Sequence, residues 1–141
     1  MKKNTDELLK ILQKSNSVDS YIEKESDNII SQIPLNEYLE KIILDKKLIR
    51  SEIIHASYLD RSYAYDILSG KKRPSRDKLL SLLMGMKLEL SEVQNLLNQT
   101  GYPVLYPRLE RDCVLIFGIE RHLSIIDINE LLFDTKNEQL K

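Results

Sequence analysis

The sequence predicts an all-α protein of 141 residues. Only four Gly and four Pro interrupt it, which favours long helices over many short strands joined by turns. With two Phe and no Trp, Leu and Ile have to fill the core, and they recur at helical spacing in segments such as LNEYLEKIILDKK at 35–47. Since 42% of the residues are hydrophobic and 30% are charged, we expect one compact domain with a loose extension.

Polar residues dominate the amino-terminal segment. Asn4 followed by Glu7 has the spacing of a helix cap, which predicts a short amphipathic helix over TDELLKILQK. Residues 15–32 are rich in Ser, Asp and Glu and weak in apolar periodicity, so they predict a linker with at most a marginal helix. A core-facing helix should begin after Pro34 and end near Lys47.

Two short helices are expected next, at 49–57 and 60–69. Asp60 should cap the second one, because its carboxylate can accept a hydrogen bond from a free amide of the first turn. Gly70 should end that helix in the left-handed conformation.

Further capping residues divide the rest of the chain. Ser75 is expected to cap RDKLLSLLMGMK, and Ser91 with Gln94 is expected to open EVQNLLNQ. After the extended stretch YPVLYP, the segment RLERDCVLIFGIERH predicts another helix. Ser124 with Asp127 then predicts the start of the last helix.

These elements predict four segments. They are an amino-terminal helix with a polar linker at 1–33, a five-helix domain at 34–101, a carboxy-terminal helical hairpin at 102–134, and a tail at 135–141 that is expected to fray.

Basic residues are concentrated in one part of the chain. Residues 46–78 contain nine Lys or Arg and four acidic residues, so this segment has a net charge of +5, whereas the whole chain has a net charge of −1. A basic segment on an acidic body is typical of a surface that faces nucleic acid, although charge clusters are more often solvated faces. Charge alone leaves both interpretations open.

The sequence contains no pattern of an enzyme or a metal site. His55 and His122 lie far apart, and neither has a second His or a Cys at ligand spacing. There is no Gly-rich phosphate loop and no nucleophile elbow, so we expect neither catalytic activity nor a cofactor. Cys113 is the single cysteine, which excludes an internal disulfide, and within CVLIFGI its thiol is expected to be buried.

The sequence also lacks the features of a targeting segment. The amino terminus, MKKNTDELLKILQK, has no apolar stretch of the length found in signal peptides, and no segment reaches membrane-spanning length. We therefore expect a cytoplasmic protein without membrane contact.

One stretch carries a resemblance to a known family. It is IRSEIIHASYLDRSYAYDILSGKKRPSRDKLLSLLMGMKLELSEVQNLL, and its most telling parts are Gly-Lys-Lys-Arg-Pro-Ser and the later Leu-Ser-x-x-x-x-Leu-Leu pattern. This stretch resembles the helix-turn-helix domain of the phage-repressor type, the family of lambda-like repressors and xenobiotic-response-element-type regulators. The resemblance implies that 34–101 is a DNA-binding domain and that the chain is a bacterial or phage transcriptional regulator, of the repressor type.

In such domains the recognition helix enters the major groove of double-stranded DNA with its amino end first. The residues that the resemblance places against base edges are Arg61, Ser62, Tyr63 and Asp66. Arg61 would contact guanine O6 and N7, and Tyr63 a thymine methyl group or a phosphate, whereas Tyr65 should face nearer the core. The residues that would hold the phosphate backbone are Arg50, Lys71, Lys72, Arg73 and Arg76.

Two positions differ from the common pattern of this family. Members usually have a small residue in the middle of the second helix and often Gly at the turn, and here these positions are Ile54 and Tyr58. Tyr58 would need an extended or strained backbone, since bulky residues at positive φ are uncommon. These differences and the acidic remainder of the chain keep open an alternative, a protein-interaction module on a repressor-like fold, such as an antitoxin-like or phage-borne inhibitor.

The hairpin at 102–134 is rich in Ile, Leu and Phe, with more apolar area than one partner helix would cover. We therefore expect a dimer or partner interface there. The residues assigned to it are Ile119, Ile125, Ile128, Leu132 and Phe133. A two-fold homodimer would place two recognition helices about one DNA turn, roughly 34 Å, apart and would imply a palindromic operator.

Overall fold

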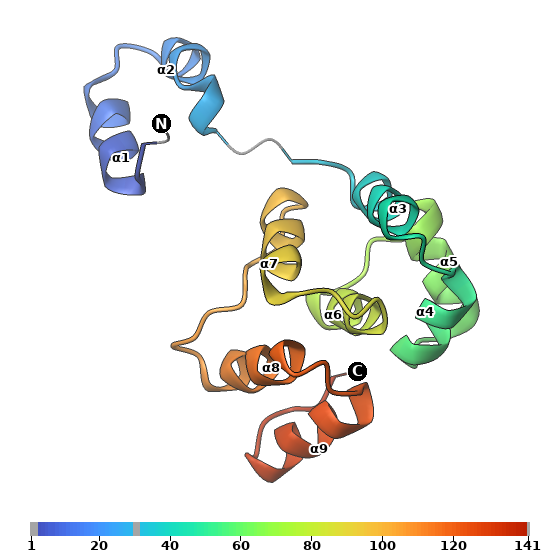
Figure 1. Cartoon of the computed structure of the whole chain (residues 1–141). Coiled ribbons are helices and arrows are strands. Elements are labelled where there is room, and N and C mark those ends of the chain that lie inside the picture. The colour runs from blue at the N-terminus through green and yellow to red at the C-terminus, as the bar shows by residue number, and fades with distance from the viewer. Residues whose placement is uncertain (1–2, 30–31, 141) are drawn as a thin grey trace. The chain divides into compact units, whose positions relative to one another are not determined.

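The computed structural model describes residues 3–29 and 32–140, and within these ranges the chain forms helices and no strand. The prediction of an all-α protein is therefore confirmed. The chain divides into two compact units, Met1–Ser31 and Gln32–Lys141 (Figure 1).

The first unit consists of α1 (Thr5–Lys14), α2 (Val18–Lys24) and a short 3₁₀ helix, η1 (Ser26–Asn28). The predicted cap is confirmed, because the amide of Glu7 donates to Oδ1 of Asn4 over 2.8 Å. In the linker predicted at 15–32, the marginal helix corresponds to α2, which Ser17 caps, and residues 30–31 of that linker lie outside the described residues. Neither helix has a buried residue, so the part of this unit that the structure describes forms no apolar core.

The second unit contains seven helices within the described residues. They are α3 (Leu35–Lys46), α4 (Arg50–Ser57), α5 (Arg61–Ser69), α6 (Arg76–Gly85), α7 (Leu90–Gln99), α8 (Glu110–Glu120) and α9 (Ile125–Asp134). In Figure 1, α6 lies between α4, α7 and α8. Leu79, Leu80, Leu82 and Leu83 of α6 are completely buried, which makes α6 the centre of the core.

Close packing around α6 depends on a glycine. A Cβ atom on Gly85 would lie 2.5 Å from the backbone oxygen of Ile53, so α4 can approach α6 only because that position has no side chain. A Cβ atom on Gly118 would likewise lie 2.5 Å from Cγ1 of Ile128, where α8 packs on α9. Glycines thus permit both close helix contacts.

Three of the predicted caps are confirmed. Side chains of Asp60, Ser75 and Ser124 accept the amides of Tyr63, Lys78 and Asp127 over 3.1, 3.2 and 3.1 Å. Gly70 ends α5 at φ 86°, as predicted.

The predicted start of α7 is wrong. Glu89 and Glu92 form the capping box there, in place of Ser91 and Gln94. Gln94 instead holds the following loop, since its amide nitrogen donates to the backbone oxygen of Leu105 and its amide oxygen accepts the Leu105 amide, each over 2.8 Å.

The tail differs from the fraying expected from Thr135 onward. Leu140 is 8% exposed, and its amide donates to Oδ1 of Asn129 over 2.8 Å. Arg111 also donates to the backbone oxygen of Glu138. Residues up to Leu140 therefore pack against α8 and α9.

Cys113 also differs from its prediction. It lies on the exposed side of α8, and its thiol donates to the backbone oxygen of Pro107 over 2.9 Å. The prediction that the thiol is buried was wrong because the whole run CVLIFGI is apolar and does not show which side of the helix faces the core. The buried side of α8 contains Leu115 and Ile119. Among the described helices, none has the length and apolar character required to cross a lipid bilayer.

Candidate nucleic-acid interface

The segment 50–69 consists of α4, a three-residue turn and α5. Tyr58 begins the turn with φ 58° and ψ 17°, so it adopts the left-handed conformation that glycine adopts most easily. The strained backbone expected at this bulky residue is therefore observed. Asp60 ends the turn by capping α5.

Ser57 holds this turn from inside. Its side chain is buried, its hydroxyl donates to the backbone oxygen of Ile54 over 2.7 Å, and its oxygen accepts the amide of Leu59 over 3.2 Å. Ile54 is 5% exposed, so this large residue in the middle of α4 is accommodated in the core.

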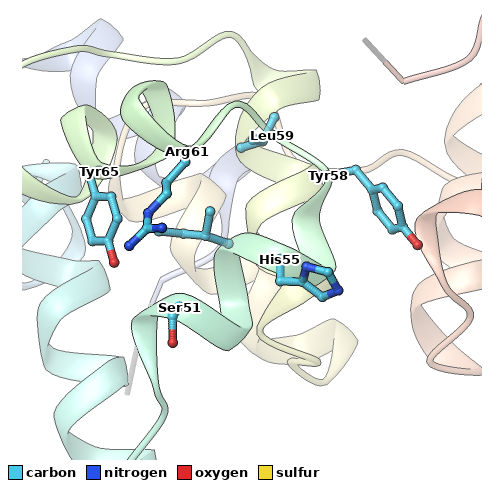
Figure 2. A pocket seen from close by; sticks show the side chains of 7 residues that line it. Ser51, His55, Tyr58, Leu59, Arg61 and Tyr65 are labelled. Atoms are coloured by element: carbon cyan, nitrogen blue, oxygen red, sulfur yellow. The ribbon is translucent and has the colours of Figure 1, made fainter.

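An open pocket of about 400 Å³ lies between α4 and the start of α5. Ile54 and Leu59 contribute its apolar lining, and its other lining residues are Ser51, His55, Tyr58, Arg61 and Tyr65. Figure 2 shows the Arg61 guanidinium beside the ring of Tyr65, with Ser51 on the neighbouring helix, whereas Tyr58 extends in the opposite direction. The carbon of the Arg61 guanidinium is 5.8 Å from the centroid of the Tyr65 ring.

Of the four residues predicted to contact bases, two are exposed and two are half-buried. Arg61 and Ser62 are exposed in the first turn of α5. Tyr63 is half-buried and packs against the core, so it does not lie in the pocket. Asp66 is half-buried, and its Oδ2 lies 3.6 Å from Nζ of Lys72.

Tyr65 was not predicted to belong to this site. It was expected to face the core, yet it is 36% exposed and lines the pocket beside Arg61. The sequence spacing of Arg61 and Tyr65 indicates this position, because residues four apart on a helix share a face. Tyr63 lies two residues from Arg61 and therefore faces another side of the helix.

Three of the predicted phosphate-contacting residues lie in the turn between α5 and α6. Lys71, Lys72 and Arg73 are exposed there. Arg73 is partly engaged, since its guanidinium lies 4.3 Å from the centroid of the Tyr102 ring and donates to the backbone oxygen of Thr100 over 2.8 Å.

The side chains of the other two residues predicted to contact phosphate form ion pairs within the chain. Arg50 donates to both carboxylate oxygens of Glu40 on α3, and these hydrogen bonds raise the pKa of Arg50 above its ordinary value. Arg76 turns inward to Asp112, with its Nη2 atom 2.8 Å from Oδ2 of that residue. The assignment of Arg76 to the phosphate backbone therefore has to be corrected: its guanidinium holds α8 against α6.

The apolar interface predicted on the hairpin also has to be corrected. Ile119, Ile125, Ile128 and Leu132 are buried inside the chain, where they join α8 and α9 to the core, and only Phe133 is exposed, at 71%. The apolar residues that these helices leave exposed are Phe117, Ile126 and Phe133.

The described residues contain no group of three or more His, Cys, Asp or Glu arranged to hold a metal ion. His122 instead approaches Glu89, with Nε2 3.4 Å from Oε1.

No protein-family model matches the chain, and no curated protein and no solved structure matches it. Function therefore has to be inferred from the residues of this chain.

Proposed function

We propose that the chain is a cytoplasmic, repressor-like transcriptional regulator that binds double-stranded DNA and reads the major groove with α5. The observation that supports this most directly is the amino end of α5. There, Arg61 and Ser62 are exposed, and Arg61 lies beside the exposed ring of Tyr65. A capped helix that presents such side chains at its amino end is suited to contact base edges.

The side chains near this end have distinct proposed roles. Arg61 is positioned by Tyr65, which limits the orientations of its guanidinium and prepares it to contact O6 and N7 of guanine. The hydroxyl of Ser62 can donate a hydrogen bond to, or accept one from, an A·T or a G·C pair. The ring of Tyr65 offers an apolar surface to a thymine methyl group. In this proposal Tyr65 takes the role that the sequence had assigned to Tyr63.

Contacts to the DNA backbone come from residues that flank α5. Lys71 and Lys72 are exposed in the turn after α5, and Arg50 is at the start of α4. Each phosphate that such a side chain neutralises releases a counterion, so affinity should fall steeply with salt concentration. Arg50 would have to exchange Glu40 for a phosphate, so we expect it to contribute less than the two lysines.

We also propose a homodimer, since regulators of this kind commonly bind palindromic operators as two-fold dimers. Phe117, Ile126 and Phe133 are the exposed apolar residues of α8 and α9 available for the contact between copies.

Selection of bound duplexes from a random library, followed by affinity measurement at several salt concentrations, tests the proposal. Arg61→Ala should weaken binding of the selected duplex by a factor of about 5 to 150 and should relax the preference at one G·C pair, since a good bidentate contact contributes roughly 1–3 kcal/mol. Arg108→Ala is the control, because Arg108 is also an exposed arginine and lies outside α4, α5 and the turn that follows α5. Absence of salt-sensitive duplex binding would overturn the proposal.

The alternative function is a protein-interaction module on the same fold. It is favoured by four exposed apolar side chains on the helices of the first unit, those of Leu9, Leu12, Val18 and Ile22. A stoichiometric protein partner recovered with the full chain, combined with a duplex selection that returns nothing, would favour this function over DNA binding.

A further inference from the structure

Two lysines approach the ring of Tyr63 from different segments. Nζ of Lys72, in the turn after α5, is 5.6 Å from the ring centroid, and Nζ of Lys78, in the first turn of α6, is 6.0 Å from it. Lys78 was not among the residues that the sequence assigned to DNA. We refer to Tyr63, Lys72 and Lys78 as the Tyr63 cluster.

The backbone on both sides of the Tyr63 cluster is fixed. The amide of Lys72 donates to the backbone oxygen of Asp66 over 3.2 Å, and the amide of Lys78 donates to Oγ of Ser75 over 3.2 Å. Tyr63 is half-buried and packs on the core. Each ammonium group thus lies about 6 Å or less from the centroid of the same ring before any ligand arrives, and this preorganisation lowers the entropy lost on binding.

The cluster keeps an excess of positive charge. Asp66 approaches Lys72, with Oδ2 3.6 Å from Nζ. Asp77 is the sequence neighbour of Lys78, but Arg111 occupies both of its carboxylate oxygens over 3.0 and 2.8 Å. Lys78 has no ion pair with any acidic residue that the structure describes. An anion that accepts hydrogen bonds from both lysines would offset the repulsion between them.

The position of the cluster indicates which anion it would meet. Tyr63 and Arg61 are two residues apart on α5, so their side chains point to different sides of that helix. A helix in the major groove has one phosphate strand on each side. Tyr63 points roughly away from the face of α5 that carries Arg61, and the two lysines reach its ring from the turn after α5 and from the start of α6. If Arg61 faces the bases, these two segments lie beside the groove, where a phosphate strand passes.

We propose that Lys78 and Lys72 together bind one backbone phosphate of the DNA, with the Tyr63 ring holding both lysines in place. This inference depends on the proposed DNA-binding function and adds Lys78 to it as a phosphate contact, while Arg76 is removed. Tyr63 acts as a positioning residue in this assignment, since its ring contacts the lysines and not the DNA.

Duplex binding as a function of salt concentration tests the inference. Lys78→Ala should weaken binding about equally for all sequences and should lower the magnitude of the salt slope by about one. Tyr63→Leu should reproduce part of this loss, because it keeps an apolar side chain and removes the ring, whereas Tyr63→Phe should bind like the original chain. Lys41→Ala is the matched control, since Lys41 is an exposed lysine of α3 without an ion pair among the described residues.

The outcomes separate the inference from the proposed function. Duplex binding that depends on Arg61 and is unchanged in Lys78→Ala would overturn the inference alone, whereas no duplex binding at all would overturn both. Lys78→Arg should restore the salt slope if charge is what matters, and it should not do so if Lys78→Ala merely disturbs α6. Thermal unfolding of each variant separates loss of folding from loss of contact.

A second measurement does not require DNA. Titration with inorganic phosphate should shift the side-chain NMR signals of Lys72 and Lys78 at a lower concentration than those of Lys41. Equal shifts at all three lysines would contradict a preformed anion site.

Discussion

Arg76 on α6 and Asp112 on α8 form an ion pair, with Nη2 2.8 Å from Oδ2, in which the Asp112 side chain is 4% exposed and the Arg76 side chain 22% exposed. Asp112 also accepts the amide of Tyr106 over 2.8 Å. Their sequence neighbours, Asp77 and Arg111, form a second ion pair, in which α6 contributes the acidic residue and α8 the basic one. Two Arg-Asp dipeptides thus join α6 and α8 crosswise.

Removal of one partner from the Arg76–Asp112 pair should destabilise the protein strongly. Asp112→Ala should lower the free energy of unfolding by about 2–4 kcal/mol, since both the partly buried Arg76 guanidinium and the amide of Tyr106 lose their acceptor. Asp77→Ala should have a smaller effect, because the Asp77 side chain is 29% exposed, whereas that of Asp112 is 4% exposed. Urea unfolding of both variants measures the difference. Equal losses would show that burial does not separate the two pairs.

Tyr58→Gly should stabilise the protein. Tyr58 has φ 58° and is 63% exposed, so glycine would relieve a left-handed backbone while removing little packing. We expect a gain of about 0.5–1 kcal/mol in the free energy of unfolding. Tyr58→Ala is the matched control, because it removes the same ring and keeps a Cβ atom at positive φ, so it should give no gain. If both variants gained equally, the ring and not the backbone would be the source of strain.

The caps could be predicted because they are local. Asp60, Ser75 and Ser124 each accept an amide three residues ahead, and this distance is fixed by the helix itself. Gln94 was given a capping role for the same reason, but its actual partner, Leu105, becomes a neighbour only after the chain has folded.

The candidate site shows the same limit. The helix that starts at Arg61 was predicted from the sequence, but Arg76 was wrongly assigned to a phosphate contact. Its ion-pair partner, Asp112, lies 36 residues later in the chain, so this pairing cannot be predicted from the residues near the turn. The hairpin residues Ile125 and Ile128 were assigned to an interface because the area that α6 and α8 cover could not be read from composition.

Gly85→Ala should be more damaging than Gly118→Ala. At Gly85 the added Cβ atom meets the backbone oxygen of Ile53 at 2.5 Å, and a backbone atom can move only if α4 moves away from α6. At Gly118 it meets the flexible side chain of Ile128, and α8 gains about 1 kcal/mol in helix propensity. We expect Gly85→Ala to lower the free energy of unfolding by about 2–3 kcal/mol and Gly118→Ala by less than that.

A second substitution checks this explanation. Ile128→Ala removes Cγ1 and Cδ1, the two atoms that a Cβ atom at position 118 would meet at 2.5 and 2.8 Å, so it should partly compensate for Gly118→Ala and should not compensate for Gly85→Ala. Purely additive losses in the Gly118→Ala, Ile128→Ala double variant would contradict the assigned contact.

Glu92 should make stability depend on pH in the acidic range. The hydrogen bond from Lys46, over 3.1 Å, lowers the pKa of Glu92 below its ordinary value of 4.5, and the amide of Glu89 adds to this effect. A carboxyl whose folded pKa is lowered stabilises the protein above its unfolded pKa, and this stabilisation is lost as pH falls through the folded pKa. Glu92→Gln should therefore be less stable than the original chain at pH 7, by about 0.5–1 kcal/mol, and the difference should shrink on acidification below pH 4.5. Lys46→Met should raise the pKa of Glu92 in an NMR titration, and an unchanged pKa would show that Lys46 does not hold it.

The carboxy-terminal residues should contribute to stability. Leu140 is 8% exposed, and burial of a leucine side chain contributes about 1.5–3 kcal/mol, so Leu140→Ala should lower the free energy of unfolding by about 2 kcal/mol. Gln139→Ala is the matched control, since Gln139 is exposed and its amide donates only a long hydrogen bond, 3.3 Å, to the backbone of Asn129. Hydrogen exchange should quicken in α9 for Leu140→Ala, because the tail is anchored to that helix at Asn129. Unchanged exchange in α9 and unchanged stability would mean that residues 135–140 fray in solution, as the sequence predicts.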